Sequence, residues 1–338
     1  MKLRVGLIGL GEAWETRHRP ALRALGDRLE VRAICDQVAH RAEQAALEFN
    51  AAAIDGFRAL AQREDVDALL MLAEQWYGSL PILAACDAGK ALYCAVTPHL
   101  EPAEALRLKH RVEESGIAFM AEFPRRQAPA TLRLKELIAT QLGDPRLLFC
   151  HRRVPVKDGP PPKVRQNTKA PEIRDLVELV DWCRYVVGRD PTSVFGIEHH
   201  VDSSASAEDY TMMNVDFSGP GPPGTGPVAQ ISCGTYMPVQ WEEAVTFRPP
   251  PALQVACQKG IAFIDLPSTL IWFDRAGRHQ ESLDSERPVG EQLLAQFYRS
   301  VTSLVRNTSG LEDAYRALRV VLAARTSHLE ARRIFLEA

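Results

Sequence analysis

The sequence lacks any apolar run near the roughly 18–20 residues that a membrane-spanning helix needs. It also lacks an excess of basic residues, since 40 Lys and Arg face 43 Asp and Glu and the net charge is −3. A general nucleic-acid-binding protein normally carries a strong basic excess. The composition therefore predicts a partner that is neither a membrane nor a nucleic acid.

Paired cysteines are also missing. The seven cysteines are scattered, odd in number and never at Cys-x-x-Cys spacing, which excludes a disulfide framework and a zinc site of that kind. No Gly-x-Ser-x-Gly or His-Glu-x-x-His occurs, so nothing indicates a serine hydrolase or a zinc peptidase. The apolar start of the chain is too short for a signal peptide. We expect a soluble cytoplasmic protein without a metal site.

The 338 residues suffice for about two domains of roughly 150 residues each. In the first 120 residues, short apolar runs alternate with helical patterns, which is typical of a parallel sheet with helices on both faces. We predict a doubly wound Rossmann-type α/β domain over residues 1–122. Its expected strands include Leu3–Gly9, Leu29–Cys35, Ala68–Ala73 and Ala91–Ala95.

The second half has many apparent strands and few helices between them. Such a pattern predicts an α+β domain over residues 123–338, built on an open, mostly antiparallel sheet. Helices are expected over Glu172–Val187, Gly290–Val305 and Leu311–Phe335. The Pro- and Gly-rich stretch Gly219–Pro227 is expected to connect two strands of a hairpin.

A glycine-rich turn follows the first expected strand. Glycines at this place let the backbone approach a pyrophosphate at a helix N-terminus, and an acid after the second strand accepts hydrogen bonds from ribose hydroxyls. Such an acid disfavours a 2′-phosphate, so NAD is preferred over NADP. The predicted cofactor contacts are Gly9, Gly11, Glu12, Ala13 and Asp36.

Trp14 departs from this fingerprint because it occupies the place of the third small residue. The helix that follows must therefore pack on the strand in a different way. The competing interpretation is a glycine-rich turn that binds no nucleotide.

Together these motifs resemble the Gfo/Idh/MocA family, the group of glucose-fructose oxidoreductase and inositol dehydrogenase. The resemblance runs through the whole chain. It is carried by Val5-Gly6-Leu7-Ile8-Gly9-Leu10-Gly11, Ala33-Ile34-Cys35-Asp36, Ala88-Gly89-Lys90-Ala91-Leu92-Tyr93-Cys94, Phe123-Pro124-Arg125-Arg126, the helix from Asp181 to Gly188, and Leu311-Glu312-Asp313-Ala314-Tyr315.

The resemblance implies oxidation or reduction of sugars, cyclitols or related polyols with NAD(P). It also implies a second domain whose sheet forms the subunit interface, hence a homodimer or homotetramer. The family's Thr-Pro-Asn stretch, which lines the cofactor, corresponds here to Ala73-Glu74-Gln75. Gln75 is therefore a further expected cofactor contact.

The chain departs from the family where the chemistry takes place. The family's Glu-Lys-Pro corresponds to Ala95-Val96-Thr97-Pro98, so the lysine near the nicotinamide is missing. In the family's Asp-x-Gly-x-His-x-x-Asp motif, Glu178 replaces the histidine while Asp181 is kept. Hydride transfer from an alcohol needs a base on the hydroxyl proton. The candidates are Glu178, Asp181 and His99; the alternative is an acidic stripe on an amphipathic helix.

Seven basic residues face two acidic ones between His151 and Arg174. The resemblance places this segment beside the substrate cleft, and guanidinium groups bind carboxylates and phosphates well. We therefore expect an acidic or phosphorylated sugar-like substrate held by Arg126, Arg152, Lys163 and Arg165. The alternative is a solvated loop.

Three functions remain open at this stage. The first is an NAD-dependent oxidoreductase that acts on a carbohydrate-like substrate by hydride transfer. A nucleotide-binding protein without redox turnover, in a binding or regulatory role, is the second. In the third, tightly held NAD serves a reaction without net redox change.

Overall fold

The computed structural model describes residues 2–73, 77–95, 101–156, 170–202, 207–238, 243, 250–283, 287–303 and 308–336. The chain forms two compact units. The first comprises residues 1–127 and 286–315, and the second comprises 128–285 and 316–338. No helix in these described stretches is both long and apolar enough to cross a membrane.

The first unit contains a parallel sheet, as predicted. All neighbouring strands run parallel, and β1 lies between β2 and β4, so the strand order reverses at β1 and β4. Ligands of such sheets bind outside the carboxyl ends of the strands at this reversal. The order is β15 (Thr308–Ser309), β6 (Phe119–Ala121), β5 (Ala91–Cys94), β4 (Ala68–Met71), β1 (Leu3–Ile8), β2 (Leu29–Cys35) and β3 (Ala52–Ala53).

Helices cover both faces of this sheet, because successive side chains of buried strands point to opposite faces. Leu7 packs into one cluster with residues of α1 (Arg19–Ala24), α2 (Ala39–Phe49) and α10 (Val289–Thr302). Ile8 packs into the other cluster, whose helical members come from α3 (Phe57–Ala61), α4 (Leu80–Asp87), α5 (Pro102–Ser115) and the first residue of α11 (Leu311–Glu330). The predicted doubly wound architecture is confirmed.

Residues 286–315 belong to the first unit. The sequence pattern had predicted that all residues from 123 onward lie in the second domain. Leu293, Leu294 and Phe297 of α10 are buried in the first unit's core, and β15 pairs with β6. The chain therefore returns to its first unit. An apolar helix pattern alone cannot indicate which sheet the helix covers.

A nine-stranded sheet forms the second unit. Only β7 and β10 run parallel among its described pairs, which confirms the mostly antiparallel prediction. The order is β14 (Gly277–Ser282), β13 (Thr269–Asp274), β12 (Ile261–Asp265), β11 (Leu253–Cys257), β7 (Pro145–Val156), β10 (Val228–Pro238), β9 (Ala207–Asp216), β8 (Ser193–Asp202) and β16 (Ile334–Phe335).

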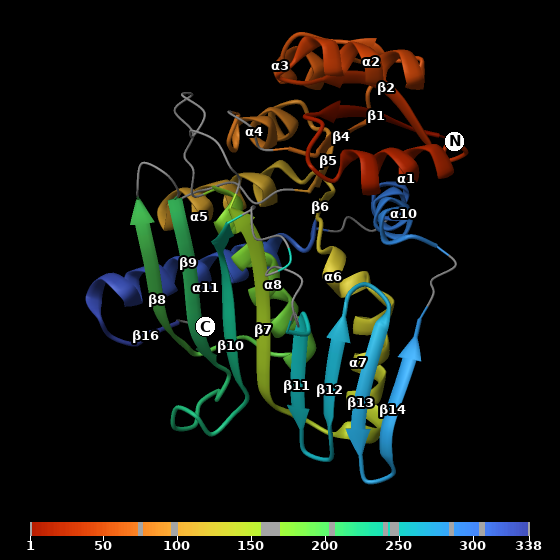
Figure 1. Cartoon of the computed structure of the whole chain (residues 1–338). Helices are drawn as coiled ribbons and strands as arrows, with labels where there is room; N and C mark the ends of the chain where they lie inside the picture. Colours follow the sequence, from red (N-terminus) through yellow and green to blue (C-terminus); the bar gives the residue numbers. More distant parts are fainter. Residues whose placement is uncertain are drawn as a thin grey trace. The chain divides into compact units, whose positions relative to one another are not determined.

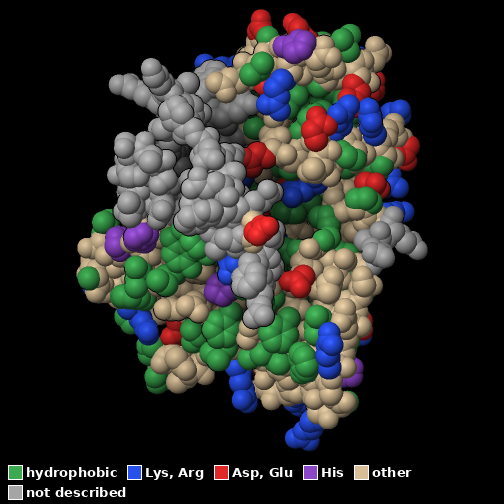
Figure 2. Space-filling model, viewed as in Figure 1, with side chains coloured by type: hydrophobic (Ala, Val, Ile, Leu, Met, Phe, Trp, Pro, Cys, Tyr) green, Lys and Arg blue, Asp and Glu red, His purple; other side chains and the backbone are tan. Residues whose placement is uncertain are grey.

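One face of this second sheet carries helices (Figure 1). The helix α8 (Ala170–Val187) contacts β7 and β10, and α7 (Pro129–Leu137) contacts β12 and β13. The last helix, α11, runs from Leu311 to Glu330 rather than to Phe335, because Ile334 and Phe335 pair with β8 instead. Hydrophobic side chains gather on the opposite, open face of the strands (Figure 2).

Candidate dinucleotide and substrate site

The glycine-rich turn lies at the carboxyl end of β1. Gly9 has a φ of +74°, a conformation that glycine adopts at little cost. A Cβ on Gly9 would lie 2.7 Å from the Cβ of Ala73, and one on Gly11 would collide with the carbonyl oxygen of Leu72. Both glycines are therefore required by the close approach of this turn to the end of β4.

Asp36 braces the turn from the end of β2. Its Oδ2 accepts a hydrogen bond from the amide of Leu10 at 2.7 Å, and its Oδ1 accepts one from the amide of Val38 at 2.9 Å. Arg41 donates from Nη2 to the carbonyl oxygen of Leu10 at 2.5 Å. These bonds fix the Asp36 carboxylate at the end of β2, the place from which an acid binds the ribose of a dinucleotide in such folds.

The turn also supplies donors for an anion. The amides of Gly11 and Ala13 donate to no acceptor among the described residues, and both residues are half-buried. Amides at the start of a helix, aided by its dipole, are a ready site for a phosphate group. These residues fit the pyrophosphate and ribose of a dinucleotide. Glu12, the other predicted contact in this turn, is exposed.

Trp14 begins a π-helix, η1, which extends to His18 and leads into α1. The indole is 5% exposed and belongs to the core cluster, and its ring centroid lies 6.0 Å from that of Phe49. The wider π turn thus accommodates a large side chain where a small residue is usual. Trp14 points into the core of the first unit and does not cover the turn.

A buried polar cluster, which the sequence analysis did not identify, lies where β5 and β6 end. Glu122 follows β6, and its Oε2 accepts a hydrogen bond from the hydroxyl of Tyr93 at 2.5 Å and lies 2.7 Å from Nε2 of His18. Its Oε1 accepts from Nη1 of Arg17. Arg17, His18, Tyr93 and Glu122 are called the Glu122 cluster below. Only the isolated acid at the end of an apolar strand could have signalled it.

Burial alone would raise the pKa of Glu122. The charge and hydrogen bond of His18 and the charge of Arg17 outweigh that effect and lower the pKa of Glu122 from 4.5 to about 2. For Tyr93, burial together with the adjacent carboxylate raises the pKa well above its usual value. The cluster therefore contains a carboxylate and a neutral phenol across the physiological pH range.

In the second unit, α8 carries the predicted catalytic acids. Asp181 is 1% exposed, and its Oδ1 lies 3.5 Å from Nη1 of Arg184. Arg184 in turn donates from Nε to Oδ1 of Asp190 at 2.8 Å. Asp181 is thus embedded in an ion-pair network. Glu178 is half-buried on the same helix.

Arg152 and Arg126, both predicted substrate contacts, each bind an acid. Arg152 Nη1 lies 2.8 Å from Oδ1 of Asp175, one helical turn before Glu178. In the first unit, Arg126 donates from Nη1 to Oδ2 of Asp313 at 2.8 Å, and its guanidinium lies over the ring of Phe123. The other predicted site residues lie outside the described residues; they are the candidate base His99, the expected cofactor contact Gln75, and the expected substrate contacts Lys163 and Arg165.

A model of a known protein family matches the first part of the chain. Residues 3–123 match the family model GFO_IDH_MocA, described as an oxidoreductase family with an NAD-binding Rossmann fold. The match lies within the Rossmann part of the chain. The resemblance inferred from the motifs is thereby confirmed.

One curated relative is dTDP-3,4-didehydro-2,6-dideoxy-alpha-D-glucose 3-reductase from Streptomyces violaceoruber. It is 27% identical over 247 residues, which cover 69% of this chain and 66% of the relative. The chain thus matches just under two thirds of that relative's length. Sequence similarity therefore extends beyond the Rossmann fold into the second unit.

Solved structures share the fold of the whole chain. Aldose-aldose oxidoreductase from Caulobacter crescentus superposes with a TM-score of 0.81 at 15% identity and covers 99% of this chain and 100% of its own. UDP-N-acetylglucosamine 3-dehydrogenase from Acidithiobacillus ferrooxidans superposes with a TM-score of 0.73 at 20% identity. The superposition covers 97% of this chain and 98% of the dehydrogenase. At such identities the likeness establishes the fold.

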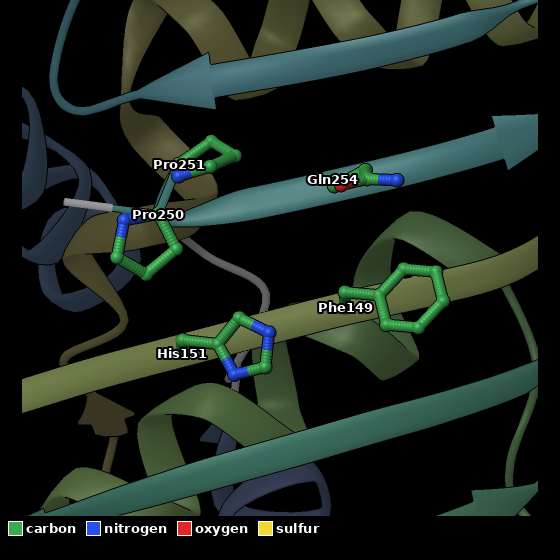
Figure 3. Close-up of a pocket in the computed structure, with 5 residues that line it drawn as sticks. All are labelled: Phe149, His151, Pro250, Pro251 and Gln254. Carbon is green, nitrogen blue, oxygen red and sulfur yellow. The ribbon is translucent and has the colours of Figure 1, made fainter. Parts of the chain in front are cut away.

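A small cavity of about 160 Å³ lies on the open face of the second sheet (Figure 3). Phe149 and His151 come from β7, Gln254 comes from β11, and Pro250 and Pro251 precede β11. Nδ1 of His151 lies 2.7 Å from the hydroxyl of Ser232. Burial, and to a smaller extent the charge of Arg153, lower the pKa of His151. This cavity contains none of the predicted site residues.

Proposed function

We propose that this chain is an NAD-preferring oxidoreductase that acts on a carbohydrate-like substrate. The observation that carries the proposal is the arrangement of Asp36 against the glycine turn, with the amides of Gly11 and Ala13 left without an acceptor among the described residues. When bound, the nicotinamide group supplies the hydride acceptor or donor. The chain's own residues bind and orient the substrate, and they exchange its hydroxyl proton.

The preference for NAD rests on charge. A 2′-phosphate beside the Asp36 carboxylate would be repelled, whereas two ribose hydroxyls can donate to it. Arg41, which binds the Leu10 carbonyl, is a cation beside this turn that would offset part of that repulsion. NADPH is therefore expected to bind, but more weakly than NADH.

Glu178 is the proposed general base. It is half-buried, and it lies one helical turn from both Asp175 and Asp181, each of which binds an arginine. A base must accept the proton of a substrate hydroxyl as the hydride leaves. Arg152, whose side chain is 34% exposed, is the proposed partner for a carboxylate or phosphate on the substrate.

The alternative of a nucleotide-binding protein without redox turnover has an observation in its favour. Asp181 and Arg126, two residues of the expected reaction site, are each held in an ion pair. The third function, a reaction with tightly held NAD and no net redox change, would share the same cofactor site.

Fluorescence titration with NADH, with NADPH in parallel, tests the proposal first. Saturable binding with NADH tighter than NADPH is the expected result, and no binding of either to nucleotide-free protein would contradict it. A screen of polyols, uronates and sugar phosphates follows. Net NADH formation supports the oxidoreductase. Product without net NADH supports a reaction in which tightly held NAD undergoes no net redox change, and binding without product supports a nucleotide-binding protein without redox turnover.

We also propose a homo-oligomer, formed through the open face of the second sheet, and a cytoplasmic location. The face exposes large apolar side chains, among them Leu147, Ile197 and Phe273. Exposed apolar patches on a folded protein mark interaction sites. The seven cysteines are buried free thiols, which is the usage of a reducing compartment.

A further inference from the structure

Glu122 connects the helical turn after the glycine loop to the ends of β5 and β6. Arg17 and His18 are the last two residues of the π-helix η1, which begins three residues after Gly11. Both direct their side chains to this one carboxylate. The backbone amide of Glu122 donates to the carbonyl oxygen of Cys94 at 2.8 Å and so fixes the carboxylate to the end of β5.

Neither π-helical side chain has a second hydrogen-bond partner in the described part of the chain. Glu122 is the only described acceptor for the guanidinium of Arg17. His18 is 1% exposed, and its Nδ1 is buried without a hydrogen-bond partner. Its ring is oriented by the bond to Glu122 and by an edge-to-face contact with Tyr93. Such unpaired buried nitrogens are rare and costly in proteins. The polar ends of Arg17 and His18 thus share one buried carboxylate.

A π-helix is an unusual start for the helix after a dinucleotide turn, and it is less stable than an α-helix without outside support. Trp14 requires the wider turn because the indole fills the core at the place of a small residue. The carbonyl oxygen of Ala13 accepts from the amides of both Arg17 and His18. A displacement of either residue would therefore move Ala13, whose own amide is a proposed phosphate donor.

We propose that Glu122 is a positioning residue of the dinucleotide site, which holds η1, and through it the amides of Gly11 and Ala13, in the geometry that binds pyrophosphate. The inference rests on the proposed NAD binding. Glu122 itself does not contact the dinucleotide. It acts through Arg17 and His18 on the backbone that does.

The test compares four proteins: the unaltered chain, Glu122→Gln, Tyr93→Phe and Glu48→Gln. Glu48 is a matched control, because its carboxylate binds Arg19 and Arg23 of the following helix α1 but not η1. Tyr93→Phe removes a hydrogen bond to the Glu122 carboxylate and leaves η1 held. Each is measured for NADH affinity, thermal midpoint and hydrogen–deuterium exchange of residues 10–24 without ligand.

Glu122→Gln is expected to raise the Kd for NADH about tenfold, the effect of losing one charge-assisted hydrogen bond, and to speed exchange in residues 10–19. Tyr93→Phe lowers the thermal midpoint but leaves the Kd within threefold. Glu48→Gln changes neither the Kd nor exchange in η1. Unchanged Kd and exchange in Glu122→Gln would overturn the proposal, as would an equal loss of affinity in Tyr93→Phe.

The outcomes also separate this inference from the proposed function. If the unaltered chain binds no dinucleotide, the proposed function fails, and the exchange of residues 10–19 then decides whether Glu122 positions η1. Where Glu122→Gln does not fold, Arg17→Gln replaces it, because Arg17 is a third exposed and its loss is better tolerated. Faster exchange and weaker NADH binding are expected there too, and their absence would overturn the proposal.

Discussion

Asp36 accepts a hydrogen bond from the amide of Leu10, the residue between the two glycines of the turn, at 2.7 Å. The same carboxylate that is expected to bind the ribose therefore also shapes the turn expected to bind the pyrophosphate. Loss of Asp36 consequently affects both halves of the proposed dinucleotide site at once.

Asp36→Ala is expected to raise the Kd for NADH by at least tenfold, because it removes both the ribose acceptor and the support of Leu10. NADPH should lose less affinity, since repulsion of its 2′-phosphate is relieved at the same time. Parallel fluorescence titrations measure the ratio of the two Kd values. Asp27→Ala, an exposed acid of the same unit, is the control. An unchanged ratio would contradict the assigned role of Asp36.

Gly11→Ala is expected to lower the thermal midpoint by several degrees. The added Cβ would collide with the carbonyl oxygen of Leu72, and backbone cannot yield as a flexible side chain can. Overpacking of this kind typically costs roughly 1–3 kcal/mol of unfolding free energy. Gly26→Ala is the matched control, because the nearest atom to its Cβ, the oxygen of Arg23, is 3.4 Å away. Equal thermal midpoints for Gly11→Ala and Gly26→Ala would show that position 11 does not require glycine.

The sequence was sufficient to predict the glycine turn after β1 and the position of Asp36 at the end of β2, because such a turn depends on local backbone geometry and on neighbours close in sequence. The Glu122 cluster was beyond such reasoning. Its members His18 and Glu122 are 104 residues apart, and only the pairing of β5 with β6 and the packing of η1 bring them together. Likewise, helical spacing placed Glu178 and Asp181 on α8 but could not show that Arg184 binds Asp181.

Glu178→Gln and Asp181→Asn are expected to have different effects. Glu178→Gln should lower kcat by roughly 10²–10⁴, the usual contribution of a general base, with little change in thermal midpoint. Asp181→Asn breaks a buried ion pair with Arg184 and should cost about 3–5 kcal/mol of unfolding free energy. Steady-state kinetics on the first substrate found, together with denaturant unfolding, separates the two. A loss of kcat of only a few fold in Glu178→Gln would exclude it as the base.

Acid should destabilise the first unit through Glu122. Its pKa is lowered from 4.5 to about 2 in the folded chain. At pH values between these two, the folded state therefore binds fewer protons than the unfolded state. The stabilisation is complete above about pH 4.5 and is lost as the pH falls toward 2. Denaturant unfolding from pH 6 to pH 2 measures it. Glu122→Gln should flatten this dependence, and Glu48→Gln should retain it; equal slopes in all three proteins would contradict the assignment.

The open face of the second sheet should determine the oligomeric state. Ile197 on β8 and Met212 on β9 are paired residues of adjacent strands, and their side chains are 43% and 36% exposed. A buried glutamate at an apolar interface is costly, so Ile197→Glu should convert the expected dimer or tetramer into monomers. Leu329→Glu on α11, where the leucine is 83% exposed, is the control and should keep its assembly. Light scattering at micromolar concentration measures the mass, and an Ile197→Glu protein that retains the full oligomeric mass would place the interface elsewhere.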